Sequence, residues 1–342
     1  MTTVPTPVVT VRAVDLTDEA DLRAWHAFEE RVHDQDRPDT PFWGVDDVLA
    51  MVRPDDPEER FLPFVAEADG STVGSGIVFV PLLDNLEKAY GQLVVAPESR
   101  GRGVGDRLVE HVLDLARGEG RSLLLLESNL PPGHDAGHPV RRFAERHGFR
   151  LSNQEVRRYL QLPVPDEQLQ AWAQEAAAHH PGYELATYEG AVPPELRASL
   201  VELRNQLAVD APTGEVDFEA GGSTVATYLE NVERVTESGR RVYETVAVLD
   251  GAVVAHSTLS APPPGQAMPF LNQWGTFVHR AHRGHRLGLA VKVASLSYVQ
   301  QRHPERTVVS TTNAVDNGPM VAINEQLGFR PVEVMVEFVR AV

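Results

Sequence analysis

The 342-residue sequence contains no cysteine, and cationic side chains are scarce beside anionic ones. Without thiols there are no disulfides, no thiolate metal sites and no cysteine nucleophile. The 31 Lys and Arg residues are outnumbered by 49 Asp and Glu residues, for a formal net charge of −18. Because nucleic-acid binding needs positively charged faces, this balance excludes nucleic acid as a partner.

Long apolar runs are also lacking. The N-terminal stretch has no basic start followed by a sustained apolar core, so we expect no signal peptide. No apolar run reaches 18 residues, so we expect no membrane partner and a cytoplasmic location. The acidic surface favours an amine or other cationic partner, although solubility alone explains it equally well.

What the sequence does contain is a loop of alternating arginine and glycine between an expected strand at 88–95 and an amphipathic helix at 104–118. The first N–H groups of a helix have no intrahelical partner, and the helix dipole is positive there. Glycines open these amides to a pyrophosphate, and arginines add charge. The loop consists of Arg100, Gly101, Arg102, Gly103, Val104 and Gly105.

The same order of features returns in the second half of the chain. A second loop consists of Arg283, Gly284, His285, Arg286, Leu287 and Gly288. The distance in sequence from Arg100 to Arg283 is nearly the same as that from Gly148-Phe149 to Gly328-Phe329. Two pairs of matching motifs with nearly the same separation in sequence indicate a duplicated domain.

Alternation and helical periodicity predict the other elements. In the first half we expect strands at 8–14, 61–68, 72–80, 122–127 and from Gly148 to 162, with helices at 17–32, 45–52 and 140–147. In the second half we expect helices at 166–179, 194–207 and 223–235, with strands at 183–188, 242–249, 252–259 and 270–278.

The pattern Arg-x-x-Gly-x-Gly after a strand, followed by Gly-Phe downstream, resembles the acetyl-CoA loop of the GNAT superfamily of N-acetyltransferases. A P-loop would need Gly-Lys-Ser/Thr, and a Rossmann loop would need Gly-x-Gly-x-x-Gly; neither spacing is present. The alternative is a helix-entry turn whose glycines serve only geometry. The resemblance covers both halves.

This resemblance implies an α/β (α+β) chain with two GNAT-fold domains, similar in architecture to mycothiol synthase. Each domain would have a mixed, mostly antiparallel sheet flanked by helices and splayed between its fourth and fifth strands. We expect an N-terminal domain at 1–163, a connecting helix at 164–181 and a C-terminal domain at 182–342.

The resemblance also implies that both loops bind acetyl-CoA as co-substrate. Backbone amides near Leu93 and Val95, and near Thr276 and Val278, would face the thioester. Asn313 and Asn317 would contact the pantetheine arm; in the first half the corresponding segment, 128–133, reads as a Pro/Gly loop. The second loop departs from the family pattern, because Arg286 stands where the first loop has Gly103.

Proton-transfer groups are less clear. Many GNAT enzymes carry a tyrosine at the positions of Ala144 and Asn324, and neither residue is a proton donor of that kind. His256 and Glu244 on neighbouring strands are the remaining candidates in the second half, and we take His256 and Asn324 as candidate catalytic residues. No metal site is expected. The simplest alternative for His256 is a hydrogen-bonded strand histidine without a catalytic role.

We expect an acyl-CoA-dependent N-acyltransferase in which a primary amine of a small molecule attacks the thioester directly. The C-terminal half is favoured as catalytic, because its polar loop 210–219 is placed to line an acceptor pocket. The alternatives are a non-catalytic acyl-CoA-binding or sensing protein and an acetyltransferase similar to mycothiol synthase. The chain would be a monomer or a homodimer.

Overall fold

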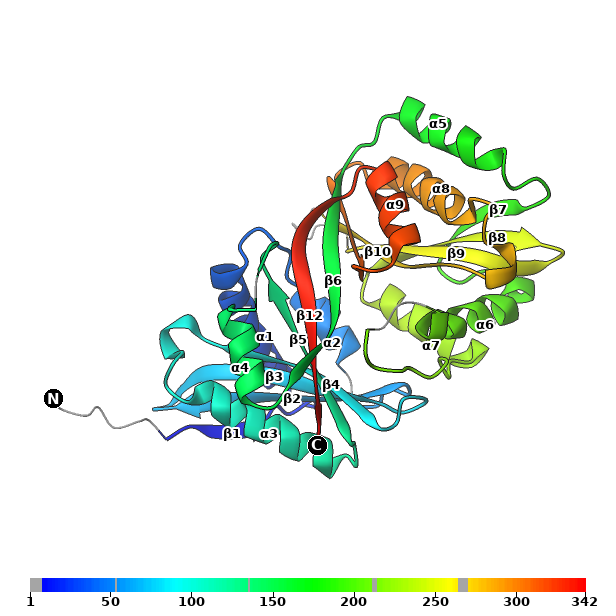
Figure 1. Ribbon diagram of the computed structural model, residues 1–342. Helices are drawn as coiled ribbons and strands as arrows, with labels where there is room; N and C mark the ends of the chain where they lie inside the picture. Colours follow the sequence, from blue (N-terminus) through cyan, green and yellow to red (C-terminus); the bar gives the residue numbers. More distant parts are fainter. Residues whose placement is uncertain (1–7, 53, 135, 211–213, 264–269) are drawn as a thin grey trace. The chain divides into compact units, whose positions relative to one another are not determined.

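Figure 1 shows the computed structural model, which describes residues 8–52, 54–134, 136–210, 214–263 and 270–342. The chain packs as two compact units. Unit 1 comprises residues 1–153 and 335–342, and unit 2 comprises residues 154–334. The units divide inside strands rather than at residues 163 and 181, where the repeat places the domain limits. Those limits stay a prediction about the duplicated sequence.

Unit 1 is built on a sheet whose neighbouring strands pair mostly antiparallel, with β4 and β5 parallel. Its strand order is β1 (Thr10–Ala13), β2 (Glu59–Ala68), β3 (Ser71–Pro81), β4 (Lys88–Val95), β5 (Leu123–Leu130) and the C-terminal part of β12 (Arg330–Ala341). Its helices are α1 (Glu19–Asp36), α2 (Val45–Met51), α3 (Val104–Gly118) and α4 (Pro139–Arg146).

Unit 2 repeats this plan, again with a single parallel pair, β10 with β11, among the described pairings. Its strand order is β6 (Arg150–Gln161), β11 (Val308–Ala314), β10 (Phe270–Val278), β9 (Ala252–Ala261), β8 (Arg241–Leu249) and β7 (Glu184–Glu189). Its helices are α5 (Asp166–Ala177), α6 (Pro194–Asp210), α7 (Val225–Glu237), α8 (Leu287–Arg302) and α9 (Gly318–Gln326).

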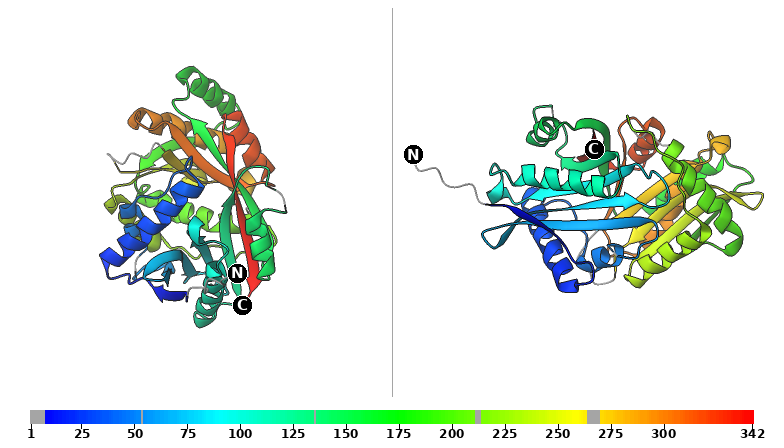
Figure 2. Two further views of the ribbon diagram at one scale, coloured as in Figure 1. Left: turned by 90° about the vertical axis from the view of Figure 1, so that its left-hand side faces the viewer. Right: turned by 90° about the horizontal axis from the view of Figure 1, so that it is seen from below.

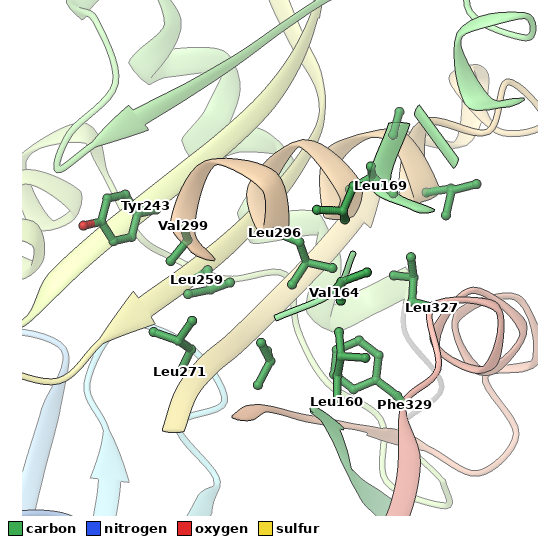
Figure 3. Close-up of a cluster of buried hydrophobic side chains, with 14 of the residues drawn as sticks. Leu160, Val164, Leu169, Tyr243, Leu259, Leu271, Leu296, Val299, Leu327 and Phe329 are labelled. Carbon is green, nitrogen blue, oxygen red and sulfur yellow. The ribbon is translucent and has the colours of Figure 1, made fainter. Parts of the chain in front are cut away.

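Helices cover both faces of the sheet of unit 2. On one face, α5 and α8 bury Leu169 and Leu296 against the strands, in the cluster drawn in Figure 3. On the other face, α6 and α7 bury Leu200 and Tyr228. This second face matters for the site, because two of its strand residues form a buried acid–histidine pair.

The sheets of both units splay at the expected place. In unit 1 the pairing of β4 with β5 ends at Gly91 and Leu126, so the last residues of β4 have no partner on β5. In unit 2 the pairing of β10 with β11 ends at Gln273 and Thr311. The predicted architecture, two mixed and mostly antiparallel sheets that are each splayed between the fourth and fifth strands, is confirmed.

The strand predictions need one correction, in the first half. Residues 128–130 were expected in a Pro/Gly loop, but β5 continues to Leu130 and the loop begins at Pro131. Leu130 is only 1% exposed. Burial of this apolar side chain favours a strand that continues through the polar residues Ser128 and Asn129.

The last strand of each sequence half leaves the unit in which it begins. Strand β6 starts in unit 1 and ends in unit 2, and β12 starts in unit 2 and ends in unit 1. The two strands lie side by side (Figure 2).

In the part of the chain that the structure describes, no helix is both long and apolar enough to cross a membrane.

Candidate active site

The two glycine-rich loops have the same backbone conformation. Gly101 and Gly103 have φ of 72° and 82°, and Gly284 has φ of 88°. Arg286 takes the left-handed conformation of Gly103, with φ of 52°. A Cβ built on Gly101, Gly103 or Gly284 would meet nothing within 4 Å. These glycines therefore serve backbone conformation and leave the start of α3 and of α8 open on the loop side.

The first arginine of each loop ties the loop to the end of the preceding strand. Arg100 Nε donates to the Val95 carbonyl at 3.1 Å, and Arg100 also pairs with Asp36 at the end of α1. Because this guanidinium is already paired with a carboxylate, its main role is to hold the loop rather than to supply unpaired charge. Arg102 is exposed and extends the positive character of the first loop.

The second loop is anchored in the same way. Arg283 Nε donates to the Val278 carbonyl at 3.2 Å, and Arg283 Nη2 donates to Asp210 at 2.7 Å. Asp210 also pairs with Arg280, and its side chain is 3% exposed. The Arg280 hydrogen bond holds the pKa of Asp210 below its usual range.

The side chain of Arg286 points away from the backbone amides of the second loop. Its guanidinium forms an ion pair with Glu175 on α5. The neighbouring His285 makes a 3.1 Å hydrogen bond through Nδ1 to the His179 carbonyl. The departure at Arg286 thus changes the side chain while keeping the backbone turn, and the amides that precede α8 keep the geometry of the first loop.

The last glycine of each loop has a different task. A Cβ on Gly105 would lie 3.0 Å from the ring of Phe143 on α4, and a Cβ on Gly288 would lie 3.0 Å from Ile323 on α9. These glycines let the loop helix approach the next helix closely. The sequence pattern alone does not separate this packing role from phosphate binding.

The three asparagines predicted for the arm or for catalysis are engaged inside unit 2. Asn317 caps α9 by accepting from the Met320 amide at 3.3 Å. Asn313 Oδ1 accepts from Arg158 at 2.9 Å and from Asn324 Nδ2 at 3.0 Å. Asn324 is 0% exposed, which favours a structural role over proton transfer.

Strand β10 carries a β-bulge at the splay, which unit 1 does not share among its described pairings. The register of β10 against β9 shifts between Gln273 and Thr276, whereas β3 pairs with β4 without a shift. A bulge leaves a residue out of the ladder and re-aims the local amides. Thr276 and Val278, two of the predicted coenzyme contacts, follow directly after it.

A buried acid–histidine pair lies beside the bulge. His256 on β9 stands opposite Phe277 of β10, and its Nδ1 makes a 2.9 Å hydrogen bond to Glu244 Oε1. The second ring nitrogen, Nε2, is buried and has no hydrogen-bond partner among the described residues. The His256 ring lies 4.0 Å from where a Cβ on Gly275 would be, so the ring edge approaches the bulge itself.

Glu244 is fully buried but stays anionic. Burial alone would raise the pKa of its carboxyl, but the Arg204 charge and the hydrogen bond from His256 outweigh burial and lower that pKa. Glu244 Oε2 also accepts from Thr258 at 2.9 Å. A carboxylate bonded to Nδ1 fixes the ring tautomer that leaves Nε2 as an acceptor.

Unit 1 places different groups at the same position. The strand registers put Ser75 opposite Val94 where unit 2 has His256 opposite Phe277. Ser75 Oγ donates to Glu29 at 2.8 Å, and burial raises the pKa of the Glu29 carboxyl to about 7. A Cβ on Gly76 would lie 2.5 Å from Phe64, so that ring fills the neighbouring space.

Sequence reasoning missed several of these residues. Arg204, Thr258 and Glu29 were not predicted, because their roles depend on tertiary contacts between a helix and a strand. The loop 210–219 was expected to line an acceptor pocket. Its first residue is the last of α6, and residues 211–213 lie outside the described part of the chain. Within the described residues, no group of three or more His, Asp or Glu side chains is placed to hold a metal.

Comparisons with known proteins agree with this geometry. Residues 59–151 match the model of the acetyltransferase (GNAT) domain family. A solved tandem GNAT protein from the clavulanic acid biosynthesis pathway, without AcCoA, is 27% identical, with a TM-score of 0.74 and 98% of each chain covered. The chain is a tandem GNAT protein. A GCN5-related N-acetyltransferase from Sphaerobacter thermophilus shares the fold at 17% identity, with a TM-score of 0.61 over 97% of this chain and 95% of its own.

One curated relative resembles part of this tandem GNAT protein. The IAA acetyltransferase of Azospirillum brasilense is 39% identical over 77 residues, or 22% of this chain. The match spans 46% of that relative, so it covers about half of its length. The match supports acetyltransferase ancestry for a single domain. It does not assign the substrate of that relative to this chain.

Proposed function

We propose that this tandem GNAT protein transfers an acetyl group from acetyl-CoA to a primary amine of a small molecule, and that unit 2 carries out the transfer. The observation that carries the proposal is the Glu244–His256 pair, whose Nε2 is an unpartnered buried acceptor beside the β10 bulge. A general base must lie where it can take a proton at the reacting centre.

The coenzyme would be held mainly by backbone. The amides that begin α8 would bind the pyrophosphate, with Arg283 fixing the loop from behind. Beyond Gln273 the pairing of β10 with β11 has ended, so this side of the strand is open to an extended arm. The amides near Thr276 and Val278 would then polarise the thioester carbonyl.

The reaction releases a proton from the attacking amine, and His256 would accept it. When acetyl-CoA is bound, it supplies the thioester that the amine attacks: a C–N bond forms, the C–S bond breaks and coenzyme A leaves as a thiolate. His256 Nε2 takes the proton lost by the attacking ammonium or amine, and Glu244 stabilises the imidazolium. The same proton can return to the thiolate through water.

Unit 1 is better suited to binding than to transfer. Its loop has the family glycines, with Gly101 and Gly103 in the left-handed region. Its β3–β4 ladder has no register shift, and Ser75 replaces the histidine. Unit 1 therefore carries the second candidate function, acyl-CoA binding without turnover. A cytoplasmic location and a monomeric or homodimeric state stay predictions.

The test is acetyl-CoA consumption, followed as free thiol release, against a panel of amines with the full-length protein. His256→Gln should lower kcat about 100-fold or more, with acetyl-CoA binding measured by calorimetry changed less than about threefold. The matched control is Ser75→Ala in unit 1, which should leave kcat within about twofold. Coenzyme binding without turnover for any amine would favour a sensing protein, and full activity of His256→Gln would remove this residue from the mechanism.

A further inference from the structure

Three polar side chains follow one another on one face of β9 in unit 2. His256, Thr258 and Ser260 are alternate residues, so they point to the same side of the sheet at intervals of about 6.6 Å. All three are buried, and each contacts a group from another element. His256 contacts Glu244 on β8, while the other two contact larger side chains that reach solvent.

Thr258 holds Arg204 from α6. Arg204 Nη2 donates to Thr258 Oγ1 at 3.2 Å and lies 3.4 Å from Glu244 Oε2. The guanidinium also lies over the Tyr228 ring, 5.5 Å from its centroid. These contacts fix the position of the guanidinium while leaving its side chain 34% exposed.

The remaining donors of Arg204 are available to a ligand. Among the described residues, neither Nε nor Nη1 has a hydrogen-bond partner within the protein. Nε–H and Nη1–H lie on different edges of the guanidinium, so each can donate a single charge-assisted hydrogen bond to a carboxylate oxygen. Because Glu244 already balances the charge of Arg204, the contribution of Arg204 is directional: its remaining N–H groups, held one alternate strand position from His256, can donate to the carboxylate of an acceptor.

Ser260 holds Trp274 at the other end of the row. Trp274 is the residue just after Gln273 in the bulged part of β10, and its Nε1 donates to Ser260 Oγ at 2.9 Å. Trp274 as a whole residue is nevertheless 49% exposed. A large, oriented and exposed aromatic surface beside a polar row is suited to an apolar ligand group.

We propose that the acceptor is an amine that also bears a carboxylate and an apolar body, as an apolar amino acid does. Its amine lies at His256 Nε2, its carboxylate accepts from Arg204 and its apolar body contacts Trp274. The inference rests on the proposed function of unit 2 and narrows its acceptor. It disfavours polyamines and amino sugars, which lack a carboxylate to pair with Arg204.

The experiment uses matched pairs of acceptors that differ only in the carboxylate: L-phenylalanine with phenethylamine, L-tryptophan with tryptamine, and L-leucine with isopentylamine. Spermidine and glucosamine complete the panel. With the full-length protein, kcat/KM should be at least about 10-fold higher for the amino acid of at least one pair, since a charge-assisted hydrogen bond discriminates by about that factor.

Two substitutions test the residues. Arg204→Gln should lower the ratio of kcat/KM within that pair about 10-fold, whereas Arg204→Lys should keep part of it. A role of Arg204 confined to supporting Glu244 would lower both members of the pair equally and leave the ratio unchanged. Trp274→Ala should lower the preference for that amino acid over glycine, which lacks an apolar side chain, about 10-fold.

The outcomes separate the two proposals. Acetylation of spermidine or glucosamine, with no preference for the amino acid in any pair, would overturn the acceptor class and leave the acetyltransferase standing. An unchanged ratio in Arg204→Gln would overturn the assignment of this residue. Binding of acetyl-CoA without acetylation of any acceptor would overturn the proposed function and this inference together.

Discussion

Asp210, the last residue of α6, accepts a 2.7 Å hydrogen bond from Arg283, the first residue of the second glycine-rich loop. Unit 1 has the same relationship between Asp36, the last residue of α1, and Arg100. In each unit a helix earlier in the chain, α1 in unit 1 and α6 in unit 2, therefore positions the glycine-rich loop that precedes α3 or α8. Because the two contacts are equivalent, their removal can show which unit performs the chemistry.

Asp210→Asn should lower kcat/KM for acetyl-CoA about 10-fold, because Arg280 and Arg283 lose their shared carboxylate and the second loop loses its position. Asp36→Asn is the matched variant and should change kcat/KM less than about twofold. Steady-state kinetics with a saturating amine measures both. The opposite ranking would assign catalysis to unit 1.

Coenzyme binding in unit 2 should depend on the backbone of the second loop more than on Arg286. Gly284 has φ of 88° and open space around its missing Cβ, so Gly284→Val strains the turn without a clash. We expect acetyl-CoA affinity in unit 2 to fall about 10-fold in Gly284→Val and to change less than about threefold in Arg286→Gly. Calorimetry, with the site of unit 1 as internal reference, measures both. Equal losses would show that the Arg286 side chain binds the coenzyme.

Lys292 on α8 should lower the stability of unit 2. It is 1% exposed, its Nζ lies 5.2 Å from the centroid of the Phe329 ring, and burial lowers its pKa to about 7. Lys292→Met keeps the volume and removes the charge, so we expect the free energy of unfolding to rise by about 2 kcal/mol below pH 7.

This gain should shrink as pH rises from 7 toward 10.5, because in that window Lys292 is neutral in the folded state but still protonated in the unfolded state. Urea unfolding at pH 6, 8 and 9.5 measures it. A gain that does not vary with pH would mean that packing, and not charge burial, sets the effect. By the offset between Arg100 and Arg283, the first copy has the buried Val109 at this position, so the fold does not require lysine there.

Glu29 in unit 1 should give a pH dependence of the opposite sign. Burial raises the pKa of its carboxyl to about 7, so between its ordinary value of 4.5 and pH 7 only the folded state holds the proton. Wild-type stability therefore falls through this window as pH rises. Glu29→Gln, which stays neutral, should match wild type below pH 4.5 and exceed it above pH 7 by about 2 kcal/mol. Parallel stability curves for the two proteins would contradict the buried-acid assignment.

Much of the local structure could be predicted from the sequence. The bounds of β4, α3 and β10 agree with the predicted 88–95, 104–118 and 270–278, because the apolar pattern is clear in these segments and a glycine or proline lies near at least one end of each. The duplication was visible because its two loops recur at one offset. His256 was found as a strand histidine near the splay, since so few proton-transfer groups remained.

The rest depended on which segments meet. A period of two shows which strand residues share a face but not which strand lies opposite, so the Glu244–His256 contact and the bulge before Thr276 could not be derived. The pairing of Asp210 with Arg283 joins residues far apart in sequence. The structural roles of Gly105 and Gly288 required the positions of the neighbouring helices.

The route of β12 has a consequence for biosynthesis. Residues 335–342 complete unit 1, where the Val342 amide donates to the Ser122 carbonyl at 3.0 Å and Arg340 Nη1 donates to the His147 carbonyl at 2.5 Å. During synthesis the first 153 residues therefore emerge from the ribosome long before β12, the strand that lies beside β5, is made. Until β12 is made, β5 presents an unpaired edge. The nascent N-terminal unit is prone to aberrant association with other chains during this time.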